Sequence, residues 1–332
     1  GPSIMPGGHE EGYLLVKDIL EKAAAQVEDG PCCTYLGPGS AGHFVKMVHN
    51  GIEYAFMQSI AECYYILREV GKLPAPTIGK IFEEWNKSED LNSYLVNITA
   101  QVLQYLDPDT GKPLVDLILD QAEQKGTGKW ASQVALDLGI PTPVINQSVI
   151  ARNLSSFKEE RKKISTLFPY SPEEKSDISL PHLEKALFLS QLGAFSEGFH
   201  ILKEASSEFS YNFNLPEVAR IWKGGCILQS RLLGRIQEAL RGEPDLLFVS
   251  PIFREKVKEY LPSLRQVCAQ ALEREIPIPA LCASLSYLDS WKREWLPANL
   301  IQAQRDFFGA HTYRRIDREG VFHTIWQKEE KE

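Results

Sequence analysis

Two residues whose side chains could transfer protons, Lys46 and Glu53, lie seven positions apart in the stretch GHFVKMVHNGIEY (residues 42–54). In an α-helix these two side chains project within ~20° of each other, two turns apart, so one small substrate could contact both. His49 and Asn50 fall on the same polar face, opposite an apolar stripe. A solvated polar face would produce the same pattern, so the pattern alone leaves both interpretations open.

The stretch is preceded by GPGSAG, Gly37 to Gly42, which spells GxGxxG. A dinucleotide fingerprint needs a strand before it, a helix after it, and a second strand that ends in Asp or Glu ~20 residues on. The third requirement fails, because the predicted helix continues past Leu67. We therefore interpret the glycines as a tight turn that lets the helix N-terminus approach another backbone closely. Gly51 lies within this helix, where a glycine lowers helix stability by ~1 kcal/mol relative to alanine. A glycine at this position therefore suggests close packing against another segment or contact with a ligand.

Two further stretches could bind an anion. Lys125 and Thr127 in QKGTGKW combine an ammonium group, a hydroxyl and flexible backbone N–H groups, which suit a phosphate. The stretch is not a Walker A loop, since Gly-Lys is followed by Trp, and a helix C-cap with a turn is the structural alternative. Arg305 and His311 lie in IQAQRDFFGAHTY among aromatic residues, where the alternative is the end of a surface helix.

Composition narrows the class of protein. Hydrophobic residues make up 43% of the 332 residues, charged residues 24%, and the formal net charge is −8. This balance is typical of a globular protein and argues against nucleic acid as a partner. No apolar run approaches the ~20 residues of a membrane span, so no membrane partner is expected. The six cysteines form no CxxC pair and the seven histidines show no ligand spacing, so we predict no metal site and a reducing, cytoplasmic location.

The periodicity predicts a mainly helical chain after a short α/β segment. Residues 1–40 resemble the end of an α/β unit, with a helix over Tyr13–Val27 and a strand at CCTYL. From Gly42 onward almost every segment between Gly, Pro, Asp and Asn punctuation is helical. FPYSPEEKSDISLP reads as a surface linker between two helical halves. The predicted helices are 42–70, 76–86, 89–105, 113–124, 130–138, 144–165, 178–207, 215–242, 251–275, 277–292 and 296–307.

Five motifs in order give the chain a family resemblance: GHFVKMVHNGIEY, QKGTGKW, ARNLSS, GGCILQS and LIQAQRDFFGAHTY. Together they resemble 6-phosphogluconate dehydrogenase, the decarboxylating enzyme of the oxidative pentose phosphate pathway, over nearly the whole chain. The resemblance implies the large all-helical C-terminal domain of that family, with a short remnant of its Rossmann-type domain. The implied organisation is a remnant at 1–40, a helical catalytic and dimerisation domain at 41–304, and a tail at 305–332 that reaches the partner subunit.

The resemblance also implies a role for each candidate residue. Lys46 would be the general base that takes the proton from the C3 hydroxyl, and Glu53 the acid that protonates the enediol at C1. His49 and Asn50 would bind substrate hydroxyls or the carboxylate. The phosphate of 6-phosphogluconate would be held by Tyr54, Lys125, Thr127 and Arg152, and Arg305 and His311 would come from the second subunit of a homodimer with exchanged tails.

The implied reaction is the NADP-dependent oxidative decarboxylation of 6-phosphogluconate to ribulose 5-phosphate, CO₂ and NADPH. The NADP site is expected mainly on an N-terminal domain of which this chain resembles only the last part. Two alternatives stay open: a catalytically silent helical dimerisation or binding module derived from the enzyme, and a related hydroxy-acid dehydrogenase with another substrate.

The chain departs from the family pattern at a few positions. Ala131 stands where Thr commonly follows the Trp of GKW, Ile325 replaces an Asn, and Lys223 stands where Arg is usual. None of these positions coincides with the implied acid or base.

Overall fold

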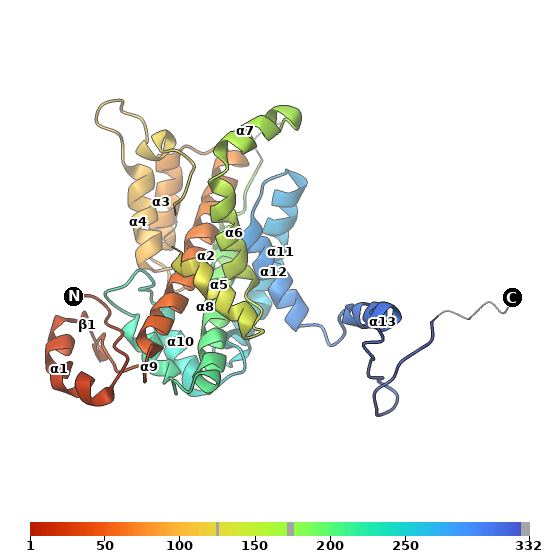
Figure 1. The fold of residues 1–332 in the computed structure, drawn as a ribbon. Coiled ribbons are helices and arrows are strands. Elements are labelled where there is room, and N and C mark those ends of the chain that lie inside the picture. Colours follow the sequence, from red (N-terminus) through yellow and green to blue (C-terminus); the bar gives the residue numbers. More distant parts are fainter. Residues whose placement is uncertain (124–125, 171–175, 327–332) are drawn as a thin grey trace. The chain divides into compact units, whose positions relative to one another are not determined.

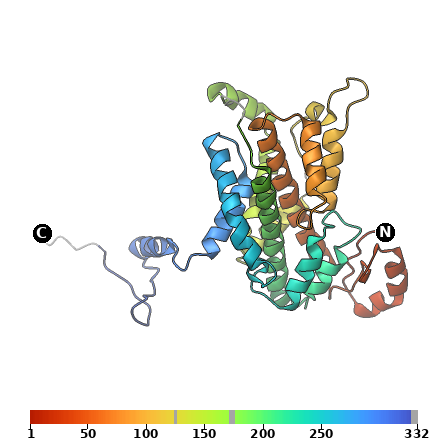
Figure 2. The same cartoon turned by 180° about the vertical axis from the view of Figure 1, so that it is seen from behind.

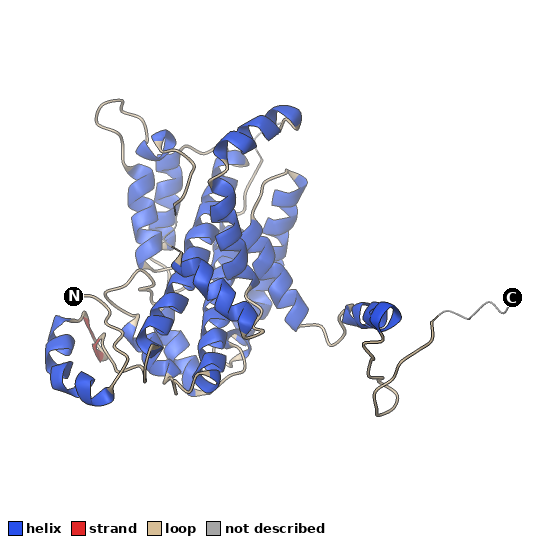
Figure 3. Cartoon of the chain, in the orientation of Figure 1, coloured by secondary structure: helices blue, strands red, loops and turns tan. Residues whose placement is uncertain are grey.

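The computed structural model describes residues 1–123, 126–170 and 176–326. The chain forms two compact units, Gly1–Tyr287 and Leu288–Glu332. Figure 3 shows that helices supply nearly all of the regular structure, and this confirms the predicted mainly helical class. The domain boundaries implied by the resemblance, at 40/41 and 304/305, stay a prediction.

The first unit begins with a helix and a short hairpin, and long and short helices follow. The elements are α1 (Glu10–Ala23), β1 (Gln26–Val27), β2 (Gly30–Pro31), α2 (Ala41–Glu69), α3 (Ala75–Trp85), α4 (Tyr94–Gln104), η1 (Leu114–Leu117), α5 (Thr127–Asp137), α6 (Pro143–Ser155), α7 (Lys158–Leu167), α8 (Leu180–Glu208), α9 (Leu215–Ile221), α10 (Leu232–Arg241), η2 (Leu247–Val249) and α11 (Arg254–Glu273). β1 and β2 pair antiparallel, with Val27 opposite Gly30. α12 (Pro279–Trp291) begins in this unit.

The two 29-residue helices α2 and α8 pack against each other at the centre of the first unit (Figures 1 and 2). Phe56 and Phe195 meet edge to face with ring centroids 5.0 Å apart, and the hydroxyls of Ser59 and Ser190 lie 3.0 Å apart. α8 is apolar on nearly all sides and buried along most of its length, as expected for a helix that neighbours enclose. α5 and α6 pack on α2, while α11 packs on α8. The polar face of α2 therefore lies in a scaffold of packed helices.

Buried glutamates connect this central pair to two other helices. α6 and α12 each begin at the second proline of an Ile-Pro-x-Pro sequence. Glu197 of α8 accepts hydrogen bonds from the first free N–H groups of α6, at Val144 (2.9 Å) and Ile145 (3.0 Å). Glu62 of α2 caps α12 in the same manner. A side-chain carboxyl group at a helix N-terminus accepts hydrogen bonds from backbone N–H groups that have no partner within the helix.

The GPGSAG turn is a close-packed backbone turn, as predicted. A Cβ on Gly42 would lie 2.1 Å from the carbonyl oxygen of Met5. Gly37 has φ +126° and would place a Cβ 2.5 Å from the carbonyl oxygen of Tyr211. Both glycines are thus required by protein backbone, which leaves the turn no dinucleotide role.

Several predicted elements differ from the structure. The helix predicted over 215–242 is interrupted between α9 and α10, where Gly225 takes φ +69°. The helix predicted over 144–165 breaks between α6 and α7, and 113–124 holds only the short η1 in its described part. CCTYL is not a regular strand, since Cys33 makes only an isolated bridge with Ile4. Apolar periodicity alone cannot reveal the break between α9 and α10, because buried apolar residues such as Ile221 and Leu232 lie on both sides of it.

In the second unit, α13 (Ala298–Gly309) is followed by a chain reversal in which Tyr313 pairs with Phe322. The helix ends at Ala310, which adopts a left-handed conformation with φ +48°. Residues 327–332 of the predicted charged tail, and residues 171–175 of the predicted linker, lie outside the described residues.

Candidate active site

Four candidate residues lie in contact along one face of α2. The Lys46 Nζ atom is 3.1 Å from His49 Nδ1, and His49 Nδ1 is 3.1 Å from Asn50 Oδ1. A Glu53 carboxylate oxygen lies 3.8 Å from the same His49 nitrogen. The helical spacing read from the sequence therefore brings the amine, the imidazole, the amide and the carboxyl into one cluster.

This face of α2 is less exposed to solvent than its polar residues suggested in the sequence. His49 is fully buried and lies edge to face against Trp222, with ring centroids 5.5 Å apart. Burial, and then the charge of Lys46, lower the pKa of His49 to about 3, although its hydrogen bond with Asn50 acts in the opposite direction. The imidazole is therefore neutral, and its buried Nε2 has no hydrogen-bond partner within the described protein.

The pKa values of Lys46 and Glu53 shift toward each other. Desolvation lowers the pKa of Lys46, against the opposing influence of the Glu53 charge. Desolvation raises the pKa of Glu53, against the influence of the Lys46 and Arg152 charges. Lys46 is exposed as a whole residue, whereas its contact with His49 is partly buried. A lysine that gives up its proton more easily and a glutamic acid that retains it longer are suited to act as base and acid.

α5 supplies a hydroxyl to this cluster. Thr127 is the first residue of α5, and its Oγ1 accepts a hydrogen bond of 2.7 Å from Asn50 Nδ2. The described part of QKGTGKW, from Gly126 onward, therefore opens a helix and does not end one. Gly126 takes φ +94° immediately before the helix. The N-terminus of a helix attracts anions.

The glycine within α2 has a packing reason. A Cβ on Gly51 would lie 2.7 Å from the Cβ of Ala131 on α5, so α5 can approach α2 only at a glycine. Ala131 is fully buried at this contact. Ala131, which stands where the family commonly has Thr, is therefore a position at which two helices pack. The close approach of α5 to α2 brings Thr127 within reach of Asn50.

Arg152 of α6 lies next to the α2 cluster, because its guanidinium stacks on Tyr54, the residue after Glu53. Its guanidinium lies 3.7 Å from the centroid of the buried Tyr54 ring, and one nitrogen is 3.7 Å from the sulfur of Met57. Stacking on an aromatic face holds the planar guanidinium while its edges stay free for an anion.

Three predicted residues are not brought into this cluster by the structure. Lys125 lies outside the described residues. Arg305 and His311 belong to the second unit, where both are exposed. Arg305 donates to Gln302 at 3.1 Å, and the His311 ring lies against Phe308 with centroids 6.0 Å apart.

Two residues near the cluster were missed at the sequence level. Trp222 packs against His49, and Cys226 lies near Lys46. Burial raises the pKa of Cys226 to about 12, so its thiol is protonated at neutral pH. Both residues flank Gly224 and Gly225, and the paired glycines were the available signal that the predicted helix bends here.

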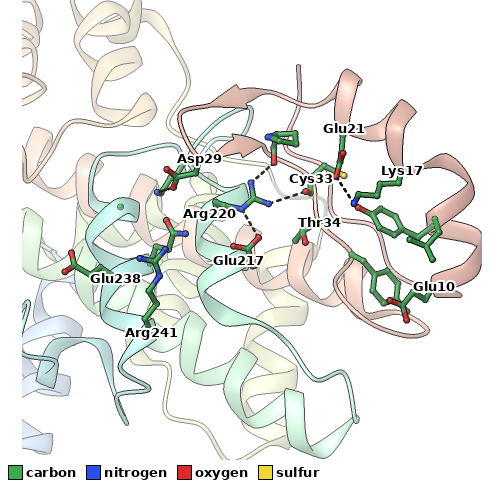
Figure 4. A pocket seen from close by; sticks show the side chains of 17 residues that line it. Glu10, Lys17, Glu21, Asp29, Cys33, Thr34, Glu217, Arg220, Glu238 and Arg241 are labelled. Atoms are coloured by element: carbon green, nitrogen blue, oxygen red, sulfur yellow. Dashed lines mark hydrogen bonds and ion pairs between the residues drawn. The ribbon is translucent and has the colours of Figure 1, made fainter.

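A cavity of about 940 Å³ lies elsewhere in the first unit, between α1 with its hairpin and α9–α10 (Figure 4). None of the predicted site residues lines it. Two of its cations are paired, since Arg220 bonds Glu217 at 2.8 Å and the carbonyl of Pro31 at 2.6 Å, and Lys223 bonds Asp29 at 2.5 Å.

Within the described ranges, no group of His, Cys, Asp and Glu side chains is arranged to hold a metal ion. In the same ranges, no helix combines the length and apolarity needed to cross a bilayer.

Comparison with known proteins agrees with this geometry. The family model of the 6-phosphogluconate dehydrogenase C-terminal domain matches residues 42–326. An NADP(+)-dependent decarboxylating 6-phosphogluconate dehydrogenase of Bacillus subtilis is 50% identical over 99% of this chain and 71% of its own length. An NAD(+)-dependent enzyme of the same species is 48% identical, and the Escherichia coli enzyme 47%.

A solved structure agrees as well. Plasmodium falciparum 6-phosphogluconate dehydrogenase, described with its cofactor NADP+ and its substrate 6-phosphogluconate, superposes with a TM-score of 0.94 at 45% identity. The match covers 97% of this chain and 70% of that one. The motifs, the helical fold and these relatives together show that the chain belongs to the decarboxylating 6-phosphogluconate dehydrogenase family.

Proposed function

We propose that this protein oxidises and decarboxylates 6-phosphogluconate to ribulose 5-phosphate and CO₂ with NADP as the oxidant, in the pentose phosphate pathway of the cytoplasm. The observation that carries the proposal is the cluster of Lys46, His49, Asn50 and Glu53 on α2. Thr127 and Arg152 extend the cluster from α5 and α6.

In this mechanism Lys46, with its lowered pKa, takes the proton of the C3 hydroxyl while C3 is oxidised. The resulting β-keto acid loses CO₂, because the C3 carbonyl accepts the electrons of the broken C1–C2 bond of the substrate. Glu53, with its raised pKa, donates a proton to the enediol carbon that becomes C1 of the product. Neutral His49 and Asn50 orient the substrate beside both groups.

Binding of the phosphate is proposed for Arg152, Thr127, Tyr54 and Lys125, together with Arg305 and His311 of a second subunit. NADP, when bound, accepts a hydride from the substrate. The GPGSAG turn does not serve as its fingerprint in this proposal, because Gly37 and Gly42 are packed against backbone. We therefore assign NADP mainly to the family's N-terminal nucleotide domain. The relatives include both NADP(+)- and NAD(+)-dependent enzymes, so the choice of NADP is part of the proposal.

The test is Lys46→Met, assayed in a form of the enzyme that carries the family's nucleotide domain. We expect kcat to fall by ~10²–10⁴ while calorimetry still detects 6-phosphogluconate binding, because only the proton acceptor is lost. Lys80→Met, at an exposed position of α3, is the matched control and should keep wild-type kcat. Near-normal turnover in Lys46→Met would reject Lys46 as the base, and a wild type without dehydrogenase activity would favour the silent module.

A further inference from the structure

In the second unit, one buried carboxylate organises the chain that follows α13. Asp306 has no exposed surface although it lies on a helix whose other residues are largely exposed. Among the described residues of this unit, four N–H groups donate to it. They are the backbone N–H of Thr312 (3.0 Å), His323 Nδ1 (2.9 Å), the backbone N–H of Thr324 (3.0 Å) and Trp326 Nε1 (2.8 Å).

These donors fill the acceptor capacity of an ionised carboxylate. Oδ1 accepts from Thr312 and His323, and Oδ2 accepts from Thr324 and Trp326. Burial alone would raise the pKa of Asp306, but the hydrogen bonds from His323, Thr324 and Trp326 outweigh it and bring the pKa to about 2. An amide at this position would direct an NH₂ group at two N–H donors, so asparagine has the right size and the wrong chemistry.

The same contacts determine the path of the chain between Arg305 and His311. Ala310 and Thr312 are non-glycine residues with φ +48° and +63°, a left-handed conformation that is strained for residues with a Cβ atom. The hydrogen bond from Thr312 to Asp306 holds this reversal closed, and Gln302 Nε2 donates to the Thr312 carbonyl at 2.6 Å. His311, six residues after Arg305, is thereby held with its backbone N–H directed to the Arg305 carbonyl.

We propose that Asp306 is a positioning residue that sets Arg305 and His311 in the geometry in which they bind substrate. This rests on the proposed function, which places both residues at the phosphate of 6-phosphogluconate. The carboxylate does not contact substrate. It ties residues 312–326 to α13. The side chains of Arg305 and His311 are thereby held in fixed positions relative to each other at the C-terminal end of the helix.

The experiment measures 6-phosphogluconate affinity by calorimetry on the full-length protein. Asp306→Asn should weaken binding by ~10-fold or more, because the buried donors lose acceptors. Asp317→Asn is the matched control: Asp317 lies in the same tail, pairs only with Arg315 among the described residues, and should leave affinity within ~2-fold. His323→Ala removes one donor and should give a smaller loss than Asp306→Asn, and it decides the question if Asp306→Asn does not fold.

A cycle with Arg305→Ala separates positioning from a general structural role. If Asp306 acts through Arg305, then Asp306→Asn should weaken affinity by a clearly smaller factor in the Arg305→Ala background than in the wild type. Equal factors in both backgrounds, or wild-type affinity in Asp306→Asn, would overturn the inference. A wild-type protein that binds no 6-phosphogluconate would instead contradict the proposed function.

Discussion

At the scale of single residues, Arg152 is the described cation with the best-defined setting for a phosphate. Tyr54 supports its guanidinium from one side at 3.7 Å, and the Tyr54 ring is itself buried. A guanidinium that is stacked on an aromatic ring can donate N–H groups to an anion, and the arginine side chain loses little further conformational freedom. A lysine at this position would retain charge without the stacked guanidinium.

We expect Arg152→Ala to weaken 6-phosphogluconate ~10–100-fold more than gluconate, since a charge-assisted contact to the phosphate contributes ~1.5–3 kcal/mol. Competition binding with both ligands measures the difference, and Arg152→Lys should recover part of it. If both ligands lose affinity equally, Arg152 supports the fold and does not select the phosphate.

At the scale of elements, the caps made by Glu197 and Glu62 couple stability to pH. Desolvation raises the pKa of Glu197 to about 8 and that of Glu62 to about 7, although backbone N–H bonds to both act in the opposite direction. The folded state therefore holds these protons more tightly than the unfolded chain does. This contribution to stability is complete below the ordinary glutamate pKa and is lost as the pH rises toward 7–8.

Glu197→Gln tests this coupling, because glutamine cannot release a proton. In urea titrations between pH 5 and 8, we expect the wild-type unfolding free energy to fall with a slope of up to ~1.4 kcal/mol per pH unit for each of the two groups. The variant should lose the part of the slope that Glu197 supplies. Glu204→Gln, at a half-exposed position of the same helix, is the control and should retain the wild-type slope. Parallel pH profiles for wild type and Glu197→Gln would contradict the assignment.

At the scale of the whole molecule, the candidate residues are divided between the two compact units. Lys46, Glu53 and Arg152 belong to the first, and Arg305 and His311 to the second. The second unit also exposes large apolar side chains, among them Leu300, Phe308 and Ile325. Such surface is typical of a segment that packs on another molecule, and a symmetric dimer with exchanged tails would supply a neighbour.

Mixed dimers test whether each site is shared. Lys46→Met and Arg305→Ala, each expected to be inactive in a form with the nucleotide domain, are unfolded and refolded together. If the tail acts on the partner, a mixed dimer contains one doubly substituted site and one intact site, so about a quarter of all sites should regain activity. No recovery, with mixed dimers confirmed by mass, would show that the tail serves its own subunit.

The sequence by itself determined the helical class and the cluster of four polar residues on α2. Seven-residue spacing on one long helix places Lys46, His49, Asn50 and Glu53 together, because helix geometry is local and needs no tertiary contact. The absence of a second strand also excluded the GPGSAG turn as a dinucleotide fingerprint, and the packed backbone of Gly42 agrees.

Only the tertiary structure decided what surrounds these residues. The burial of His49 against Trp222, the approach of α5 at Gly51 and the contact of Glu197 with α6 all join segments distant in sequence. From the sequence, polar residues on one side of a helix predict an exposed face. The pattern carries no information on whether another segment of the chain covers that face. Desolvation by such covering segments, and not the residue type, sets the pKa shifts on which the proposed chemistry depends.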